Sequence, residues 1–233
     1  IPPSIPMILY GALSNTSIVQ LFVAGIVPGV LGGFLLMALS YYFAVRYNLP
    51  REDGFSLPRL WHATKDAAWA LVLPIIILGG IFGGLVTATE GAGLAVVTAL
   101  FIGVFIYREI DLGRLYHSLV EGVVQTAVVM LLVASSAVLG LYLTETELPQ
   151  RLAQGILSIT TNKLIVLMII NVFLLFLGMI LHGAAAIILT VPIFMPLVHQ
   201  LGIDPVQFGI LLTLNIALGQ QTPPVASVLV TSC

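Results

Sequence analysis

Charged residues are scarce in this sequence: lysine, arginine, aspartate and glutamate together make up 8% of its 233 residues. A soluble domain carries roughly 25% charged residues. With 59% hydrophobic residues and a mean hydropathy of +1.13, the chain has too little polar surface to cover a water-soluble globule. The composition therefore excludes a soluble domain and indicates a protein whose solvent is lipid.

Other features that the sequence lacks exclude further classes of protein. The net charge of −2 offers no basic surface to attract nucleic acid. The single cysteine, Cys233, rules out an intrachain disulfide framework. The sequence contains no H-E-x-x-H, G-x-S-x-G or Walker motif and no cysteine pair, so we expect neither an enzyme nor a nucleotide site. Energy for work across a membrane must then come from an ion gradient or from another subunit.

Four apolar stretches in the first two thirds of the chain are long enough to cross a bilayer, which takes about 20 mostly apolar residues. They cover residues 18–45, 67–86, 89–107 and 118–143. The short loop 46–66 is rich in arginine and lysine, and such loops stay in the cytoplasm, so we place it there. Within it, Ser56-Leu57-Pro58 predicts the start of a short surface helix, and residues 145–160 predict a second one on the outer side.

The last third has a different pattern. Residues 163–200 predict a helical hairpin that dips into the membrane and turns back at the small residues between Gly178 and Ala186, with Pro192 and Pro196 interrupting the second arm. Asp204 then starts an apolar run, 206–218, which as a helix spans only about 20 Å and is too short to cross.

Two Pro-Pro pairs, Pro2-Pro3 and Pro223-Pro224, adjoin short apolar runs at the two ends of the chain. Proline removes a backbone donor and disfavours helix in the preceding residue, so both segments must unwind. Paired interruptions of this kind indicate a secondary transporter's binding site, and the two runs head in opposite directions by the count of spans, as an inverted repeat requires. The alternative is a pair of merely structural proline kinks.

A broken helix exposes carbonyl oxygens at one half and amide N–H groups at the other. Carbonyls suit a sodium ion, whereas amides and the positive helix end suit a carboxylate. Around the second break these groups are the carbonyl of Gly219 and the hydroxyl of Thr222, with the hairpin tip expected opposite them.

Several polar residues within apolar stretches have two interpretations each. Glu90 is an intramembrane acid and so a functional candidate, but Thr87-x-x-Glu90 also fits a capping box, which we favour. His182 either contacts substrate and titrates, or closes a tight turn through a hydrogen bond; the sequence leaves both open. Asn171 and Asn215 are expected to form hydrogen bonds between helices rather than to act as ligands.

Five motifs resemble the large membrane subunit of TRAP (tripartite ATP-independent periplasmic) transporters. They are IPPSIPMILYG at 1–11, GGIFGGLVTATEGA at 79–92, AAIILTVPIFMP at 185–196, GIDPVQFG at 202–209 and TPPV at 222–225. The matches follow the family's order over nearly all of the chain. The chain also opens at Ile1 without a basic n-region and stops within a motif, so we expect no signal peptide and a longer polypeptide whose first third to half and last helices are absent here.

The resemblance implies an all-α integral membrane protein, an inverted-repeat transporter of the elevator type with a re-entrant helical hairpin and broken helices. Its implied parts are the end of the first-repeat broken helix at 1–17, a connecting span with a cytoplasmic amphipathic segment at 18–66, scaffold helices at 67–160, and the second-repeat hairpin and broken helix at 161–233. Residues 1–17 and 161–233 would form the transport domain.

The function implied by the resemblance is sodium-driven uptake of a small organic acid, such as a C4-dicarboxylate, sialic acid or a sugar acid, across the bacterial inner membrane. The implied partners are a small membrane subunit, a periplasmic substrate-binding protein and the lipid bilayer, with Na⁺ as the coupling ion. Two other classes stay open: a stand-alone ion-coupled carboxylate transporter that needs no binding protein, and a membrane enzyme or assembly scaffold without transport.

The resemblance also implies site residues. Those carried over to sodium binding are Ile1, Pro2, Gly178, Gly219, Thr222 and Val225, and those assigned to the substrate are Pro3, Ser4, His182 and Pro223. The chain departs from the family's usual pattern in having His182 in place of aspartate, Ala88 in place of proline, and Gln220 and Gln221 in place of apolar residues. Loss of the aspartate puts the charge balance of the second ion site in question.

Overall fold

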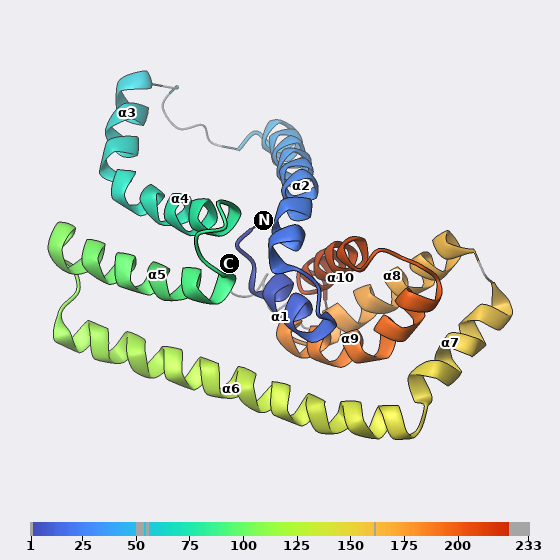
Figure 1. Ribbon diagram of the computed structural model, residues 1–233. Helices are drawn as coiled ribbons and strands as arrows, with labels where there is room; N and C mark the ends of the chain where they lie inside the picture. Colours follow the sequence, from blue (N-terminus) through green and yellow to red (C-terminus); the bar gives the residue numbers. More distant parts are fainter. Residues whose placement is uncertain (1, 50–53, 55, 161, 224–233) are drawn as a thin grey trace. The chain divides into compact units, whose positions relative to one another are not determined.

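The structure, a computed structural model, describes residues 2–49, 54, 56–160 and 162–223 (Figure 1). Its elements are α1 (Ile5–Ser14), α2 (Ile18–Arg46), α3 (Leu57–Asp66), α4 (Ala68–Phe82), α5 (Ala88–Phe101), the π-helix η1 (Ile102–Ile106), α6 (Leu112–Glu145), α7 (Leu148–Ile159), α8 (Lys163–Ile180), α9 (Gly183–Gln200) and α10 (Pro205–Gly219). No strand occurs among these described residues, so the prediction of an all-α protein is confirmed.

The chain divides into two compact units. The first unit comprises residues 1–3 and Gly25–Leu119 and contains α3, α4 and α5. The second unit comprises Ser4–Ala24 and the chain from Val120 onward, and contains α1, α7, α8, α9 and α10. The helices α2 and α6 are each divided between the two units. The predicted partition into transport and scaffold parts stays a prediction.

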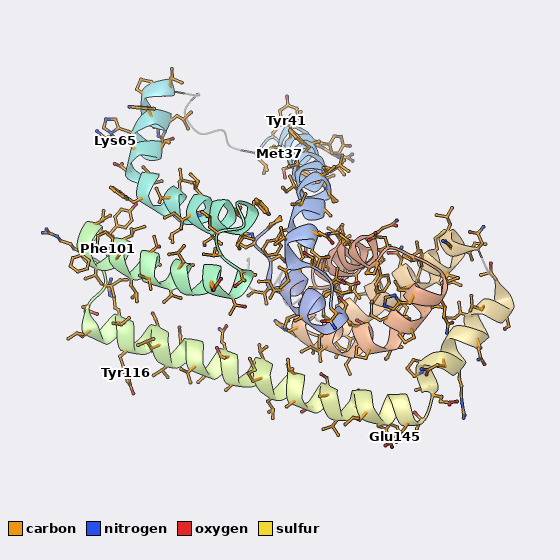
Figure 2. The ribbon with its side chains drawn as sticks, in the orientation of Figure 1. Met37, Tyr41, Lys65, Phe101, Tyr116 and Glu145 are labelled. Carbon is orange, nitrogen blue, oxygen red and sulfur yellow. The ribbon has the colours of Figure 1, made fainter. Side chains whose placement is uncertain are left out.

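Five described helices are long and apolar enough to cross a membrane: α2, α5 together with η1, α6, α8 and α9. In four of them at most 22% of the apolar window is buried within the chain, and α9 alone is mostly buried. Figure 2 shows the exposed side chains that stand out along α6 between Tyr116 and Glu145. Apolar side chains in that number need an apolar solvent, so the chain is part of a multi-pass membrane protein.

In the first unit, the expected span at 67–86 is shorter than its apolar run. The helix α4 stops at Phe82, because Gly83 closes the last turn and Gly84 adopts φ +69°, a conformation that ends a helix. Its 15 residues reach only about 22 Å. The preceding α3 forms as expected after Ser56 and meets α4 at a bend of 63°.

The helix α5 begins at the capping box predicted from its sequence. The backbone N–H and the hydroxyl of Thr87 both donate to Oε2 of Glu90, at 2.8 and 2.9 Å, and the Glu90 N–H donates back to the Thr87 hydroxyl at 3.3 Å. The carboxylate therefore satisfies free groups at a helix start. The interpretation of Glu90 as a cap is confirmed.

In the second unit, α9 is the central helix: 61% of its apolar span is buried, compared with none of that of α6. It runs as one 18-residue helix through Pro192 and Pro196, so the predicted interruption at these prolines is wrong. Each proline removes one N–H donor from the helix ladder. The buried residues on either side, among them Val191 and Met195, keep the helix packed and override this local cost.

The two helices of the predicted hairpin are present, with the break at Leu181 and His182 between α8 and α9, and the re-entrant course of the hairpin in the membrane stays a prediction. Its two arms touch through the edge-to-face rings of Phe173 and Phe194, 5.6 Å apart. Beyond that contact each arm packs more closely on other helices, because α8 lies against α10 and α9 lies against α1 (Figure 1). The hairpin is thus built into a four-helix arrangement rather than standing as an isolated pair.

The short helix α1 is held on the second short helix, α10. The fully buried Tyr10 donates from its hydroxyl to the carbonyl of Pro205, at 2.7 Å, at the first residue of α10. Its ring fills the space beside Gly209, where a methyl group would come within 2.7 Å of Cδ1 of Tyr10. At the same helix start, Oδ1 of Asp204 accepts from Val206 N–H at 2.7 Å, as expected for its N-cap.

Candidate ion and substrate site

The helices α8 and α10 cross backbone to backbone at Gly178 and Gly219. Both glycines are buried. A methyl group on Gly219 would lie 2.8 Å from the Cα and the carbonyl carbon of Gly178, and one on Gly178 would lie 3.1 Å from the Cα of Gly219. Only a residue without a side chain permits this approach. The structure therefore brings together two of the residues that the resemblance assigned to the second sodium site.

A polar pair joins the same two helices further from the tip. The side-chain amide of Asn215 on α10 donates to the side-chain oxygen of Asn171 on α8, and also to the carbonyl of Leu211 at 2.9 Å. These two side chains therefore bond to each other inside the helix pair, as their sequence context predicted.

The second break lies directly after this crossing. The helix α10 ends at Gly219, and the hydroxyl of Thr222 donates to the Gly219 carbonyl at 2.7 Å while the Thr222 N–H donates to the same oxygen at 2.9 Å. The carbonyl of Gly219 therefore already accepts two hydrogen bonds. The Thr222 hydroxyl acts here as a donor, and no described residue donates a hydrogen bond to it, so its lone pairs are available to a cation.

The hairpin tip presents the start of α9 without a side-chain cap. His182 occupies the N-cap position, with φ −62° and ψ 142°, and its side chain is exposed and makes no capping hydrogen bond. Of the two interpretations of His182, the hydrogen-bonded closing of a turn finds no support within the described residues. The exposed imidazole lies next to the uncapped amides at the start of α9, and free amides at a helix start attract anionic groups.

Consecutive residues at the end of α10 touch both arms of the hairpin. Gly219 contacts Gly178 before the break, and the side chain of Gln220 lies over Gly183, the first residue after it. A methyl group on Gly183 would lie 3.1 Å from both Nε2 and Oε1 of Gln220. The sequence had marked Gln220 only as a departure from the family pattern and had not singled out Gly183 at all. Nothing local in the sequence signals this contact, which depends on how α10 meets the tip.

The first break is described in part. Pro2 is buried and Pro3 is exposed, and the helix α1 begins at Ile5 after Ser4, whose hydroxyl makes no capping bond. No helix therefore runs through Pro2 and Pro3, as predicted. These two prolines belong to the first unit, whereas Ser4 and the hairpin belong to the second.

Three of the assigned residues lie at or beyond the ends of the described chain. Ile1 and Val225 lie outside the described residues, and Pro223 is the last described residue, exposed in the turn after α10. Whether any of the assigned residues binds sodium or substrate stays a prediction.

The described part of the chain contains no group of three or more histidine, cysteine, aspartate or glutamate side chains that would hold a metal ion. Uncharged oxygen atoms of hydroxyls and backbone carbonyls are ligands suited to a hard cation that binds weakly enough to be released. The end of α10 beside the hairpin tip offers oxygens of that kind in Thr222 and the neighbouring backbone.

Comparison with known proteins gives the family. The model of the family "Tripartite ATP-independent periplasmic transporter, DctM component" matches residues 1–233. The isethionate TRAP transporter permease protein DctMQ of Oleidesulfovibrio alaskensis is 42% identical over 226 residues, which are 97% of this chain and 36% of that protein.

Two further relatives align over a similar length. The 2,3-diketo-L-gulonate TRAP transporter large permease protein YiaN of Escherichia coli is 39% identical, and the sialic acid TRAP transporter large permease protein SiaM of Vibrio cholerae is 40% identical. Each alignment covers 98% of this chain and 54% of the relative. The chain thus spans about half the length of these relatives or less. It belongs to the DctM family, the DctM component of tripartite ATP-independent periplasmic transporters.

Proposed function

We propose that this chain is part of the large permease subunit of a TRAP transporter and that it couples the entry of sodium to the uptake of a small organic acid across the bacterial inner membrane. The family match over residues 1–233 carries the transporter assignment. The substrate would belong to the classes of the curated relatives, such as sialic acids and sugar acids, or be a C4-dicarboxylate. Its partners would be a small membrane subunit and a periplasmic binding protein.

The sodium proposal rests on the end of α10. There Gly178 and Gly219 bring α8 against the last turn of α10, and the Thr222 hydroxyl lies in the turn that follows. The ion would be bound by oxygens of Thr222 and of the adjoining backbone. The organic anion would meet the uncapped start of α9 and the exposed His182. In the elevator mechanism that we propose, α1, α8, α9 and α10 would move together.

Uptake into proteoliposomes tests this function. The complete permease is reconstituted with its small subunit, and uptake of labelled N-acetylneuraminate, 2,3-diketo-L-gulonate and succinate is followed with and without an inward Na⁺ gradient. The proposed periplasmic binding protein is added or left out. We expect uptake of one of these acids that requires both the gradient and the binding protein.

Other results would favour the alternatives. Sodium-driven uptake that ignores the binding protein would indicate a stand-alone carboxylate transporter. Absence of any sodium-dependent uptake, combined with absence of stabilisation by sodium, would favour a membrane enzyme or scaffold, because a ligand that binds only the folded state raises its stability.

A further inference from the structure

Two consecutive residues at the end of α10 contact the two sides of the hairpin break. Gly219 presses its backbone against Gly178 in the last turns of α8, and Gln220 places its side-chain amide over Gly183 at the start of α9. The tip therefore straddles the end of α10. The first contact is rigid, because it joins two backbones, whereas the second is made by the far end of a flexible side chain.

The amide of the half-buried Gln220 lies directly over the backbone of Gly183. Its Cδ, Nε2 and Oε1 would lie 3.3, 3.1 and 3.1 Å from a methyl group on Gly183, so the amide occupies the space that a side chain there would need. Among the described residues, no hydrogen bond is made by this amide. Because Gly183 has no side chain, the Gln220 amide can lie against the backbone of the first turn of α9.

From this geometry we propose that Gln220 is a positioning residue, which seats the hairpin tip on the end of α10 and thereby sets how tightly the break binds sodium. The proposal rests on the sodium site of the proposed function. Thr222 follows Gln220 by two residues, so a change in how the tip is seated changes what the hydroxyl and the neighbouring carbonyls face. Gln220 acts through the tip and need not touch the ion.

The test measures the response of the purified intact permease to sodium chloride alone. The thermal unfolding midpoint is recorded against Na⁺ concentration, with choline chloride holding the ionic strength constant, because a bound ion raises stability with its concentration relative to its dissociation constant. For Gln220→Ala we expect the curve to move to Na⁺ concentrations about threefold or more higher, the range of coupling between residues in contact. Gln221→Ala changes an exposed neighbour of the same type and should overlay the wild type.

Two further variants separate the proposed effect of Gln220 on the position of the hairpin tip from a general loss of structure. Gln220→Met keeps the length of the side chain and its contact with Gly183, so it should restore the wild-type sodium response. Gly183→Ala should displace the amide and shift the curve as Gln220→Ala does, whereas in the Gln220→Ala background it should add little, because the displaced atoms are gone. Should Gln220→Ala fail to fold, Gly183→Ala and Gln220→Met carry the test.

The outcomes separate this inference from the proposed function. A wild-type protein that responds to sodium no more than to choline would overturn the sodium function and the seating role with it. A wild type that responds to sodium while Gln220→Ala and Gln221→Ala both overlay it would overturn the seating role alone. The same holds if Gly183→Ala leaves the sodium response unchanged.

Discussion

Replacing Gly219 with alanine tests the close crossing of α8 and α10 on which the site depends. The new methyl group would lie 2.8 Å from two backbone atoms of Gly178 and from the carbonyl oxygen of Leu175. Carbon atoms in good contact are about 3.5–4.0 Å apart, so the helices must separate by roughly 1 Å. Such overpacking costs about 1–3 kcal/mol, and alanine at a helix end recovers at most about 1 kcal/mol. We expect a net loss of up to about 3 kcal/mol of unfolding free energy, centred on about 1–2 kcal/mol.

The assay is thermal unfolding of the purified protein in detergent, with two variants for comparison. Gly178→Ala brings its methyl group only to 3.1 Å from the Gly219 Cα, so its loss should be smaller. Gly155→Ala on α7 has nothing within 4 Å of the new methyl group and should be neutral or slightly stabilising. A Gly219→Ala protein that melts with the wild type, or a Gly155→Ala protein that is destabilised as much as Gly219→Ala, would show that the crossing at Gly219 is not tight.

Three further changes test single groups near the break. Thr222→Ala should weaken sodium-dependent stabilisation more than it lowers the melting temperature without sodium, while Thr222→Ser keeps the hydroxyl and should behave as wild type; equal sodium affinity in Thr222→Ala would count against the assignment. His182→Asp restores the charge usual in the family and should raise sodium affinity in the same titration, and an unchanged or lower affinity would exclude the tip from the ion site. Asn215→Leu strands the amide of Asn171 and should lower the unfolding free energy; in the cycle completed by Asn171→Leu and the double change, the pair should show a coupling of about 0.6 kcal/mol, up to about 1.7, and a simple sum of the two single losses would contradict the pairing.

Much of the fold is predictable because its boundaries depend on local chemistry. Asp204 and the Thr87–Glu90 box cap their own helices, and each cap is readable from a few neighbouring residues. The hairpin break near His182 follows from small residues between two apolar runs. Elements of this kind need no knowledge of what packs against them.

Two predictions from the sequence are wrong, the end of the span at 67–86 and the interruption of the second hairpin arm. In the first, hydropathy carries no information on backbone conformation, and in the second, packing overrides the helix-breaking preference of proline. An apolar count runs on past Phe82, although Gly84 at positive φ ends the helix there. Pro192 and Pro196 suggest an interruption, but α9 is the most buried of the span-length helices and stays continuous. Burial is a property of the folded unit and cannot be read from the proline positions.

The candidate site was predictable only to the extent that the family pattern placed its residues. The resemblance named Gly178 and Gly219 together, and the structure brings them into contact. The contact between Gln220 and Gly183 was not predictable, because it depends on the register at which α10 reaches the tip. Roles for Ile1 and Val225 lie outside the described residues and stay predictions.

Direct binding of ²²Na⁺ to the purified permease is the measurement closest to the central claim, that the unwound end of α10 and the hairpin tip hold the coupling ion. We predict saturable ²²Na⁺ binding that unlabelled Na⁺ displaces and K⁺ does not, and a weaker affinity in Thr222→Ala than in Thr222→Ser. Absence of saturable binding to the wild type, or binding that Thr222→Ala leaves unchanged, would rule out an ion site at the end of α10.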